Sequence, residues 1–353
     1  MKKLFTKLLF IPLGFALLTP TFAQDGLAET LKDLAERNAE GYLGPVVTAF
    51  GTGVNSGTFH RAKPHKILGF DVTLNVTGIS IPEAGQEFEF VIPDNEIQTP
   101  PVAVGASSYQ IPISFATLYS SGQMVPTFFG DKEGGEIPVN TVDARAEILD
   151  YLVTETGQTA ANVELLAGSA IDAAVNALEP LPTPGGIGLP VFATVMPQFS
   201  VGLPMNVELT FRGFKTEVDG DEFGFNGFGA KIGFSEFIPL FPVALSAGFY
   251  STSLTLAEVV EAKNTILTLQ ASKSIPFITV YGGLGLESSS MSVSYDLEPE
   301  IGDPIPIEFD LEGDNKTRII AGLRLKLALL SINADINAGE YTAYNLGVGL
   351  TLR

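Results

Sequence analysis

The stretch LLSINADINAG, residues 329–339, alternates apolar and polar side chains with a period of two. In an extended chain, Leu330, Ile332 and Ala334 lie on one face, and Ser331 and Asn333 lie on the other. This pattern predicts a strand with one apolar and one polar face. The fold depends on what each face contacts.

Segments with this period fill the chain from about residue 187 to its end. They include MNVELTFRGF (205–214), NGFGAKIGF (226–234), NTILTLQAS (264–272), TRIIAGLRLKL (317–327) and YTAYNLGVGLTLR (341–353). Each has roughly the nine to eleven residues that a tilted strand needs to cross a bilayer. Counting segments gives nine strands after residue 190 and two to five before it. We therefore expect an all-β membrane protein, a closed antiparallel outer-membrane β-barrel of about 12–14 strands.

A soluble β-sandwich is the alternative for any single half-buried strand. A sandwich must cover every apolar row with a second sheet, whereas lipid covers the outer wall of a barrel. The opposite faces here carry charged residues and many glycines, which suit a wet lumen. Closure also leaves no unpaired strand edge. These features together favour the membrane barrel.

The chain begins MKKLFTKLLFIPLGFALLTPTFAQDG, with three lysines, a short apolar run and small residues. This is typical of a cleaved export signal, which we place at residues 1–23. Without Lys2, Lys3 and Lys7 the chain has 17 basic and 40 acidic residues, a charge near −23. Such a surface repels nucleic acid. The absence of cysteine excludes disulfides, thiolate metal sites and lipid attachment to a cysteine.

The amino half is less regular. Residues 24–41 predict an amphipathic helix, from the spacing in LAETLKDLAERNAEG (27–41). Residues 42–92 predict the first barrel strands, from YLGPVVTAFGTG (42–53) and KILGFDVTLNVTGIS (66–80). Residues 93–186 form an insertion with two helical stretches, at 142–152 and 159–179. Because it is too long for a bare loop, we expect a plug inside the barrel or a cap over its mouth. Residues 187–353 supply the main barrel strands.

The links between strands predict the orientation of the barrel. If the final strand ends in the periplasm, the short links near 328–329 and 273–276 are periplasmic. The long, acidic links at 215–225 and 296–316 then lie outside the cell. Asp219, Asp221 and Glu222, and the carboxylates of 296–314, lack the spacing of a helix-loop-helix calcium site. Solubility and loose divalent bridging to lipopolysaccharide suit these loops better.

Six charged residues lie opposite the apolar rows and are candidates for lumen contacts: Glu208, Arg212, Lys231, Arg324, Lys326 and Asp335. They could line a transport path, or they could form an ion-pair network that fills a narrow barrel. His60 and His65 are the two histidines of the chain. Their spacing fits no zinc signature, and neighbouring basic residues predict a solvated basic turn. We expect no catalytic residue, metal or cofactor, and no enzyme activity.

Three stretches carry a resemblance: PQFSVGLPMNVELTFRGF (197–214), GFGAKIGFSEFIPLFPVALSAGFY (227–250) and GYLGPVVTAFGTGVNSGTFHRAKPHKILGFDV (41–72). They resemble an uncharacterised family of predicted outer-membrane proteins from Gram-negative bacteria. The plan of a helical amino-terminal piece, a barrel and long outer loops is remotely similar to the long-chain fatty-acid transporter family. The chain departs from a common outer-membrane pattern because it ends in Leu352 and Arg353 and not in an aromatic residue. It also contains no tryptophan, so any aromatic girdle must be built from Tyr and Phe.

The expected function is passive or gated passage of a small hydrophobic or amphipathic solute through the outer membrane. The alternatives are a surface binding or structural barrel without transport, and a secreted soluble β-rich protein. The expected partners are outer-membrane lipid and lipopolysaccharide, while the oligomeric state stays open. The position of the insertion distinguishes transport from a surface role. An insertion that fills the lumen favours gated transport, and one that folds outside the barrel favours a surface role.

Overall fold

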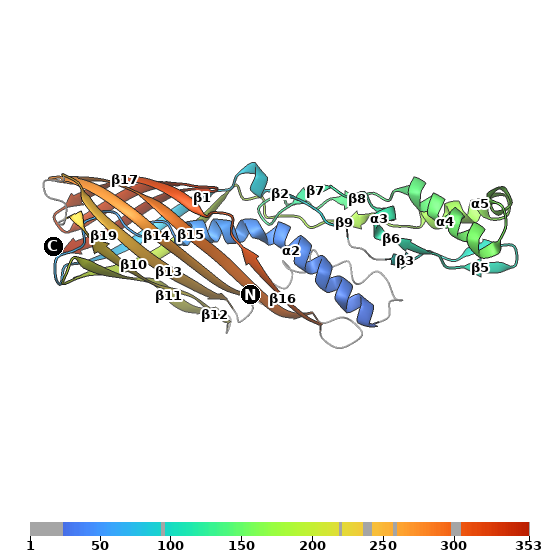
Figure 1. Ribbon diagram of the computed structural model, residues 1–353, viewed down its shortest axis with the longest axis horizontal. Coiled ribbons are helices and arrows are strands. Elements are labelled where there is room, and N and C mark those ends of the chain that lie inside the picture. The colour runs from blue at the N-terminus through green and yellow to red at the C-terminus, as the bar shows by residue number, and fades with distance from the viewer. Residues whose placement is uncertain are drawn as a thin grey trace.

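Ten antiparallel strands close into a barrel in the computed structural model (Figure 1). The structure describes residues 24–92, 96–218, 221–235, 242–256, 260–297 and 305–352. The predicted export signal at 1–23 lies outside these residues, as do Asp219 and part of the acidic link 296–316. Within the described residues, no helix has both the length and the apolar character needed to cross a membrane.

Barrel strands that follow one another along the chain are hydrogen-bonded neighbours in the barrel. The first of them, β1, pairs with both β10 and the last strand, β19, and this closes the ring. The barrel strands are β1 (Phe70–Ser80), β10 (Val191–Leu203), β11 (Val207–Val218), β12 (Asp221–Gly233), β13 (Ala244–Leu256), β14 (Val260–Ile275), β15 (Ile278–Leu297), β17 (Thr317–Leu327), β18 (Leu330–Ala338) and β19 (Thr342–Leu352). A further strand, β16 (Ile305–Glu312), pairs with residues 290–297 at the end of β15. We call the end where β1 begins and β19 ends the closed end, and the other the extension end.

The side-chain alternation follows the predicted faces. On β14, Leu267 and Leu269 are each 52% exposed on the outer wall, whereas Thr268 between them is 1% exposed and faces inward. Exposed apolar side chains recur on the outer wall of the other strands, including Phe211, Phe228, Leu284, Ile319, Leu323, Leu346 and Leu350. An apolar outside and a polar inside are the reverse of a soluble protein and match a barrel in lipid.

The strand count corrects the expected 12–14. Nine barrel strands follow residue 190, as predicted, but only β1 precedes it in the described chain. Residues 42–53 belong to a helix, so their predicted strand was wrong. The valines, threonines and glycines of this stretch have low helix propensity, and tertiary packing overrides that preference.

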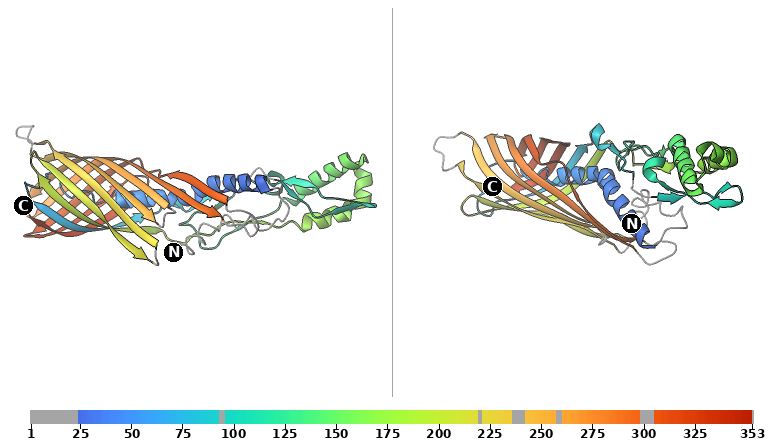
Figure 2. Two further views of the ribbon diagram at one scale, coloured as in Figure 1. Left: turned by 90° about the horizontal axis from the view of Figure 1, so that it is seen from below. Right: turned by 45° about the vertical axis from the view of Figure 1, so that its right-hand side comes forward.

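Helix α2 (Gln24–Val54) enters the barrel from the extension end and runs along the lumen (Figures 1 and 2). Its glycines allow close approach to the wall. A Cβ added at Gly51 would lie 1.9 Å from Ser289 Oγ, and one at Gly53 would lie 2.6 Å from Thr194 Cγ2. Side chains alone fill a barrel of about eight strands, and this slightly wider barrel is filled by a helix with small residues.

Residues 81–190, which we call the extension, project from the barrel along its long axis (Figures 1 and 2). Four short strand pairs build it: β2 (Glu87–Glu89) with β7 (Met124–Pro126), β3 (Glu96–Gln98) with β6 (Pro112–Ser114), β4 (Val102–Val104) with β5 (Ser107–Tyr109), and β8 (Glu136–Ile137) with β9 (Leu181–Pro182). Its helices are η2 (Glu83–Gly85), α3 (Phe115–Leu118), α4 (Thr141–Thr156) and α5 (Ala160–Asn176). The long helices α4 and α5 lie where the sequence predicts helices.

The extension has its own apolar core, in which Ile113, Leu118, Ile148, Leu152 and Ile171 are fully buried. Of the two alternatives for the insertion, a plug and a cap, the structure therefore excludes the plug. The lumen is instead occupied by α2, which the sequence placed before the barrel.

Tyr42 of α2 joins the extension to the mouth of the barrel. Its ring packs edge-on against Phe88 and Phe128, and its hydroxyl donates a hydrogen bond to the carbonyl of Gly185 at 2.9 Å. Burial raises the pKa of Tyr42 to about 12, so the hydroxyl stays a donor at neutral pH.

We predict that Gly51→Ala destabilises the folded barrel by about 1–3 kcal/mol, because the added methyl group overlaps Ser289. Gly44→Ala is the matched control: it lies in the same helix with no atom within 4 Å of the added Cβ, and should stabilise by up to about 1 kcal/mol. Heat-modifiable gel mobility of the detergent-folded protein measures both. Equal effects of the two variants would show that α2 does not contact the wall at Gly51.

Candidate functional site in the barrel lumen

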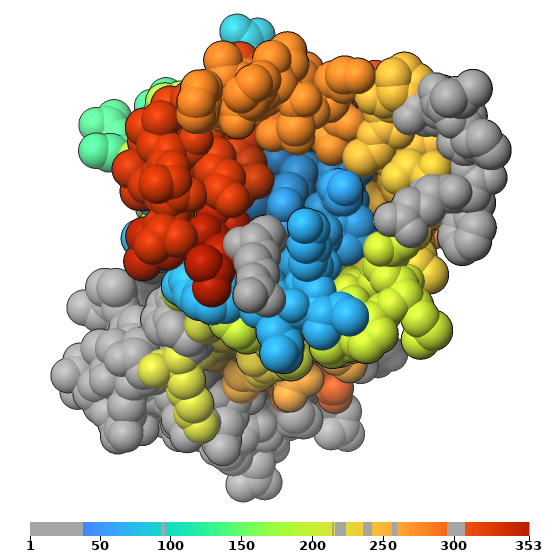
Figure 3. Space-filling view, turned by 90° about the vertical axis from the view of Figure 1, so that its left-hand side faces the viewer, coloured from blue at the N-terminus to red at the C-terminus, as the bar shows by residue number. Residues whose placement is uncertain are grey.

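The lumen is filled by the end of α2 and by residues 55–69, which connect α2 to β1. Figure 3 views the closed end, where the blue part of the chain lies in the middle of the barrel. Residues 55–60 of this connection are all buried. The site is therefore an interface between the chain's own plug, which we define as residues 38–69, and the barrel wall.

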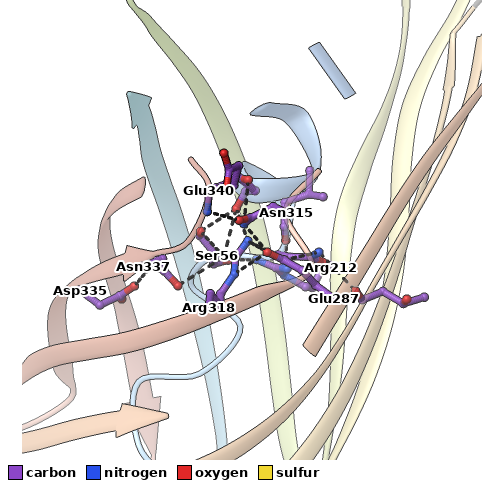
Figure 4. A network of polar contacts seen from close by, with 12 residues as sticks. Ser56, Arg212, Glu287, Asn315, Arg318, Asp335, Asn337 and Glu340 are labelled. Atoms are coloured by element: carbon purple, nitrogen blue, oxygen red, sulfur yellow. Dashed lines mark hydrogen bonds and ion pairs between the residues drawn. The ribbon is translucent and has the colours of Figure 1, made fainter. Parts of the chain in front are cut away.

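A buried ion pair lies at the centre of this interface (Figure 4). Arg318 of β17 and Glu287 of β15 are fully buried, with Arg318 Nη2 2.5 Å from Glu287 Oε2 and Nε 3.0 Å from Oε1. Asn55 of the plug donates to Glu287 Oε2 at 2.9 Å, and Asn315 donates to Oε1. Each charge of the pair neutralises the other away from water. Because Asn55 bonds to Glu287, the pair also links the plug to the neighbouring strands β15 and β17.

Two arginines of the wall cap the end of α2. Arg212 donates to the carbonyl of Val54 and, at 2.8 Å, to that of Ser56. Arg318 donates to the carbonyl of Thr52 at 3.3 Å and to Ser56 Oγ at 3.0 Å. The last carbonyls of a helix lack intrahelical partners and carry partial negative charge, so guanidinium groups stabilise this helix end.

A second polar cluster fixes residues 60–65 near the closed end. His60 Nε2 lies 2.8 Å from Asp71 Oδ2, and His65 Nδ1 lies 2.7 Å from Glu208 Oε2. Lys231 Nζ lies 2.7 Å from the other oxygen of Glu208. The predicted solvated basic turn was therefore wrong for both histidines, which are buried against carboxylates of the wall.

The structure places five of the six candidate lumen residues inside the barrel, buried: Glu208, Arg212, Lys231, Arg324 and Asp335. Lys326 is half-buried near the closed end. Glu208 and Lys231 pair with each other, whereas Asp335 accepts from Tyr281 at 2.8 Å and Asn345 at 2.9 Å. Arg324 donates to Ser331 at 2.7 Å. Of the candidates, Arg212 contacts the end of α2, and Glu208 and Lys231 belong to the histidine cluster.

Sequence reasoning did not single out Arg318, Glu287 or the two histidines as lumen residues. Arg318 has the same strand parity as Arg324, so the alternation itself could have identified it. The histidines lie on an irregular segment, where no periodicity predicts the direction of a side chain.

Several buried polar atoms at this interface have no hydrogen-bond partner within the described chain. They include both amide atoms of Asn75 on β1 and of Asn264 on β14. Among the described residues, no group of three or more His, Cys, Asp or Glu side chains is arranged to hold a metal ion. The contacts described between plug and wall are hydrogen bonds and ion pairs.

A family model described as "Family of unknown function (DUF6588)" matches residues 1–352. The chain belongs to this family. No curated protein matches the chain. The family match agrees with the expected uncharacterised family, whereas no link to the long-chain fatty-acid transporter family is shown.

Two solved structures are similar to this family member at low identity. One is Ail, the attachment invasion locus protein of Yersinia pestis, in complex with the heparin analogue sucrose octasulfate: 8% identity, a TM-score of 0.21, and 81% of this chain and 100% of that chain covered. The other is a loop L8 deletion mutant of OmpT, an outer membrane protein of Vibrio cholerae: 10% identity, a TM-score of 0.23, and 80% and 98% covered. The barrel assignment rests on the strand pairing described above.

We predict that Arg318→Met destabilises the barrel by about 3–5 kcal/mol, because Glu287 is left buried without its counter-charge. The double variant Arg318→Met/Glu287→Met should be less destabilised than Arg318→Met alone, since no unpaired charge remains. Thermal unfolding followed by gel mobility, with the single variant Glu287→Met included, gives the double-mutant cycle. Strictly additive effects would mean that the two groups do not interact.

Proposed function

We propose that this protein is an outer-membrane barrel that anchors its extension and presents it at the cell surface, in a binding or structural role. One observation carries the proposal: the chain's own plug occupies the lumen, while the extension folds outside it. A surface role needs a membrane anchor, here the barrel, and a domain presented outside the membrane, here the extension. It does not need an open path for solutes through the lumen.

The outer wall supports location in the outer membrane. Every barrel strand exposes large apolar side chains on its outer face. Within the described chain, no second sheet covers them. A secreted soluble protein would expose this surface to water, so the third alternative loses support. Detergent dependence remains the simplest check of this point.

The links support an orientation with the extension outside the cell. Three of the four links at the closed end are tight turns, at 204–206, 276–277 and 328–329, and the fourth is the longer link 234–243; this end also carries the end of β19. The extension end has short links at 219–220, 257–259 and 339–341, but it also carries the two longest connections, the extension and the β15–β16 hairpin. Outer-membrane barrels have short periplasmic turns and longer outer loops.

The surface of the extension suits contact with cationic partners. Residues 81–190 contain 15 Asp and Glu residues but only Lys132 and Arg145 as basic residues. Arg145 joins α4 to α5 by binding Glu164 at 2.5 Å and Asp172 at 2.8 Å, and these hydrogen bonds raise the pKa of its guanidinium group. Most of the remaining carboxylates of the extension are exposed. Divalent cations bridging to lipopolysaccharide, or a basic protein, fit this charge.

Gated passage is the second candidate, favoured by the polar character of the plug–wall interface. Moving the plug would uncover hydrogen-bonding groups and ion pairs, including the unpartnered amides of Asn75 and Asn264. Such a path suits small polar solutes better than the hydrophobic or amphipathic solute expected from the sequence. The two candidates differ in whether any solute crosses the intact protein.

Labelling of single introduced cysteines tests whether the extension is displayed at the cell surface. The method applies directly because the chain has no native cysteine. Leu165→Cys on the extension and Met205→Cys at the closed end replace side chains that are 85% and 86% exposed. In intact cells we expect a membrane-impermeant maleimide to label Leu165→Cys, and to label Met205→Cys only after the outer membrane is permeabilised. Equal labelling of both in detergent is the control. Labelling of Met205→Cys alone in intact cells would place the extension in the periplasm and contradict the proposal.

A further inference from the structure

The turns at the closed end expose large apolar side chains. We define the collar as Ile67, Leu68, Met205, Phe277 and Leu329, whose exposed fractions are 56%, 72%, 86%, 66% and 54%. They come from the connection before β1 and from three separate turns. Turn tips are ordinarily polar, so an apolar residue at each of these positions needs an explanation.

The backbone conformation of two collar residues adds to this observation. Leu68 and Met205 have φ values of 59° and 61°, in the left-handed region where glycine and asparagine are favoured. All the non-glycine residues with positive φ in the described chain, Leu68, Met205, Asn206 and Ala328, lie at this end. The apolar side chains are therefore kept at positions where a glycine would relieve strain.

Exposed positive charges surround the collar. Lys63, Lys66 and Lys273 are exposed, and Lys326 is half-buried. The carboxylates of the described residues at this end, Asp71 and Glu208, are buried and paired with His60, His65 and Lys231. The described closed end thus presents positive charge, although the whole chain has a formal net charge of −20.

We propose that the collar and the lysines around it together bind anionic phospholipids in the leaflet at the closed end. The apolar side chains enter the interfacial layer, and the lysines extend to the lipid phosphates. This inference rests on the barrel spanning a membrane, as proposed above, and goes on to name the lipid class at one end of it.

Continuity with the outer wall favours lipid over a soluble partner. On β17, exposed Leu323, Leu325 and Leu327 lead along the wall to Leu329 in the turn. On β15, Val280 and Ile278 lead in the same way to Phe277. The surface that contacts acyl chains therefore continues into the collar, where apolar side chains and lysines together match a membrane interface.

A cavity beside Lys63 offers space for a headgroup. It has a volume of about 280 Å³ and is lined by Lys63, Pro64, Asn206, Gly233, Ser235 and Ala244, among others. The lysine provides the charge for a phosphate, and the serine and asparagine side chains are of the hydrogen-bonding type that headgroup hydroxyls bind.

The test counts phosphatidylglycerol and phosphatidylcholine retained by the detergent-folded protein in native mass spectrometry. We expect the wild type to retain phosphatidylglycerol in preference to phosphatidylcholine. In the variant Lys63→Gln/Lys66→Gln/Lys326→Gln, the retention of phosphatidylglycerol should fall roughly fivefold or more, since the loss of even one lysine–headgroup contact has an effect of this size. The matched control, Lys132→Gln/Lys263→Gln/Lys316→Gln, removes the same charge at the extension end and should retain the lipid. Unchanged retention in the variant lacking Lys63, Lys66 and Lys326, or equal retention of both lipids by the wild type, would overturn the proposal.

A second variant separates lipid binding from turn stability. Leu68→Gly/Met205→Gly should raise the thermal stability of the barrel in detergent, because glycine relieves the positive φ, and should lower phosphatidylglycerol retention. Lysine-dependent binding of an acidic peptide without lipid retention would assign the collar to a protein partner and overturn the proposal. Failure of the collar test leaves the barrel a membrane protein, whereas solubility of the folded chain in plain buffer would remove both proposals.

Discussion

Capping of the α2 carbonyls by Arg212 and Arg318, with Glu287 neutralising Arg318, is the interaction on which the rest of the structure depends. A buried guanidinium group is tolerated only where its charge and donors are satisfied. Here the wall supplies the arginines and the plug supplies the carbonyls. Neither half is satisfied alone, so the barrel and its plug form one folding unit.

This dependence also explains the unusual composition of the inner wall. The lumen holds histidine, lysine, arginine and carboxylate side chains because the plug contacts the wall through polar groups. The apolar residues that would form the core of a soluble protein lie outside, where lipid covers them. The extension has a conventional apolar core of its own, and a smaller apolar cluster around Ile79, Phe129 and Ala343 joins it to the barrel.

The sequence predicted what periodicity determines and failed where packing inside a cavity determines the structure. The strands after residue 190, their inward and outward faces and helices α4 and α5 follow directly from spacing. Residues 42–54 have the composition of a strand, and their helix depends on glycines fitting against Ser289 and Thr194. The basic neighbours of His60 and His65 predict a solvated turn, but the burial of both histidines depends on Asp71 and Glu208, which only the closed barrel brings near. The sequence leaves the insertion as either a plug or a cap, because length alone does not distinguish a filled lumen from an external extension.

The central claim is that α2 seals the lumen, and flux through a lockable barrel tests it most directly. Gly53→Cys/Thr194→Cys places two thiols where an added Cβ at residue 53 already contacts the Thr194 side chain, in a chain without other cysteines. Our account predicts that oxidation cross-links helix to wall in most molecules, and that liposomes show no conductance or small-solute uptake in either redox state, while a general porin in the same vesicles does. Flux that is present when the pair is reduced and stops when it is oxidised would contradict the sealed anchor and establish gated passage.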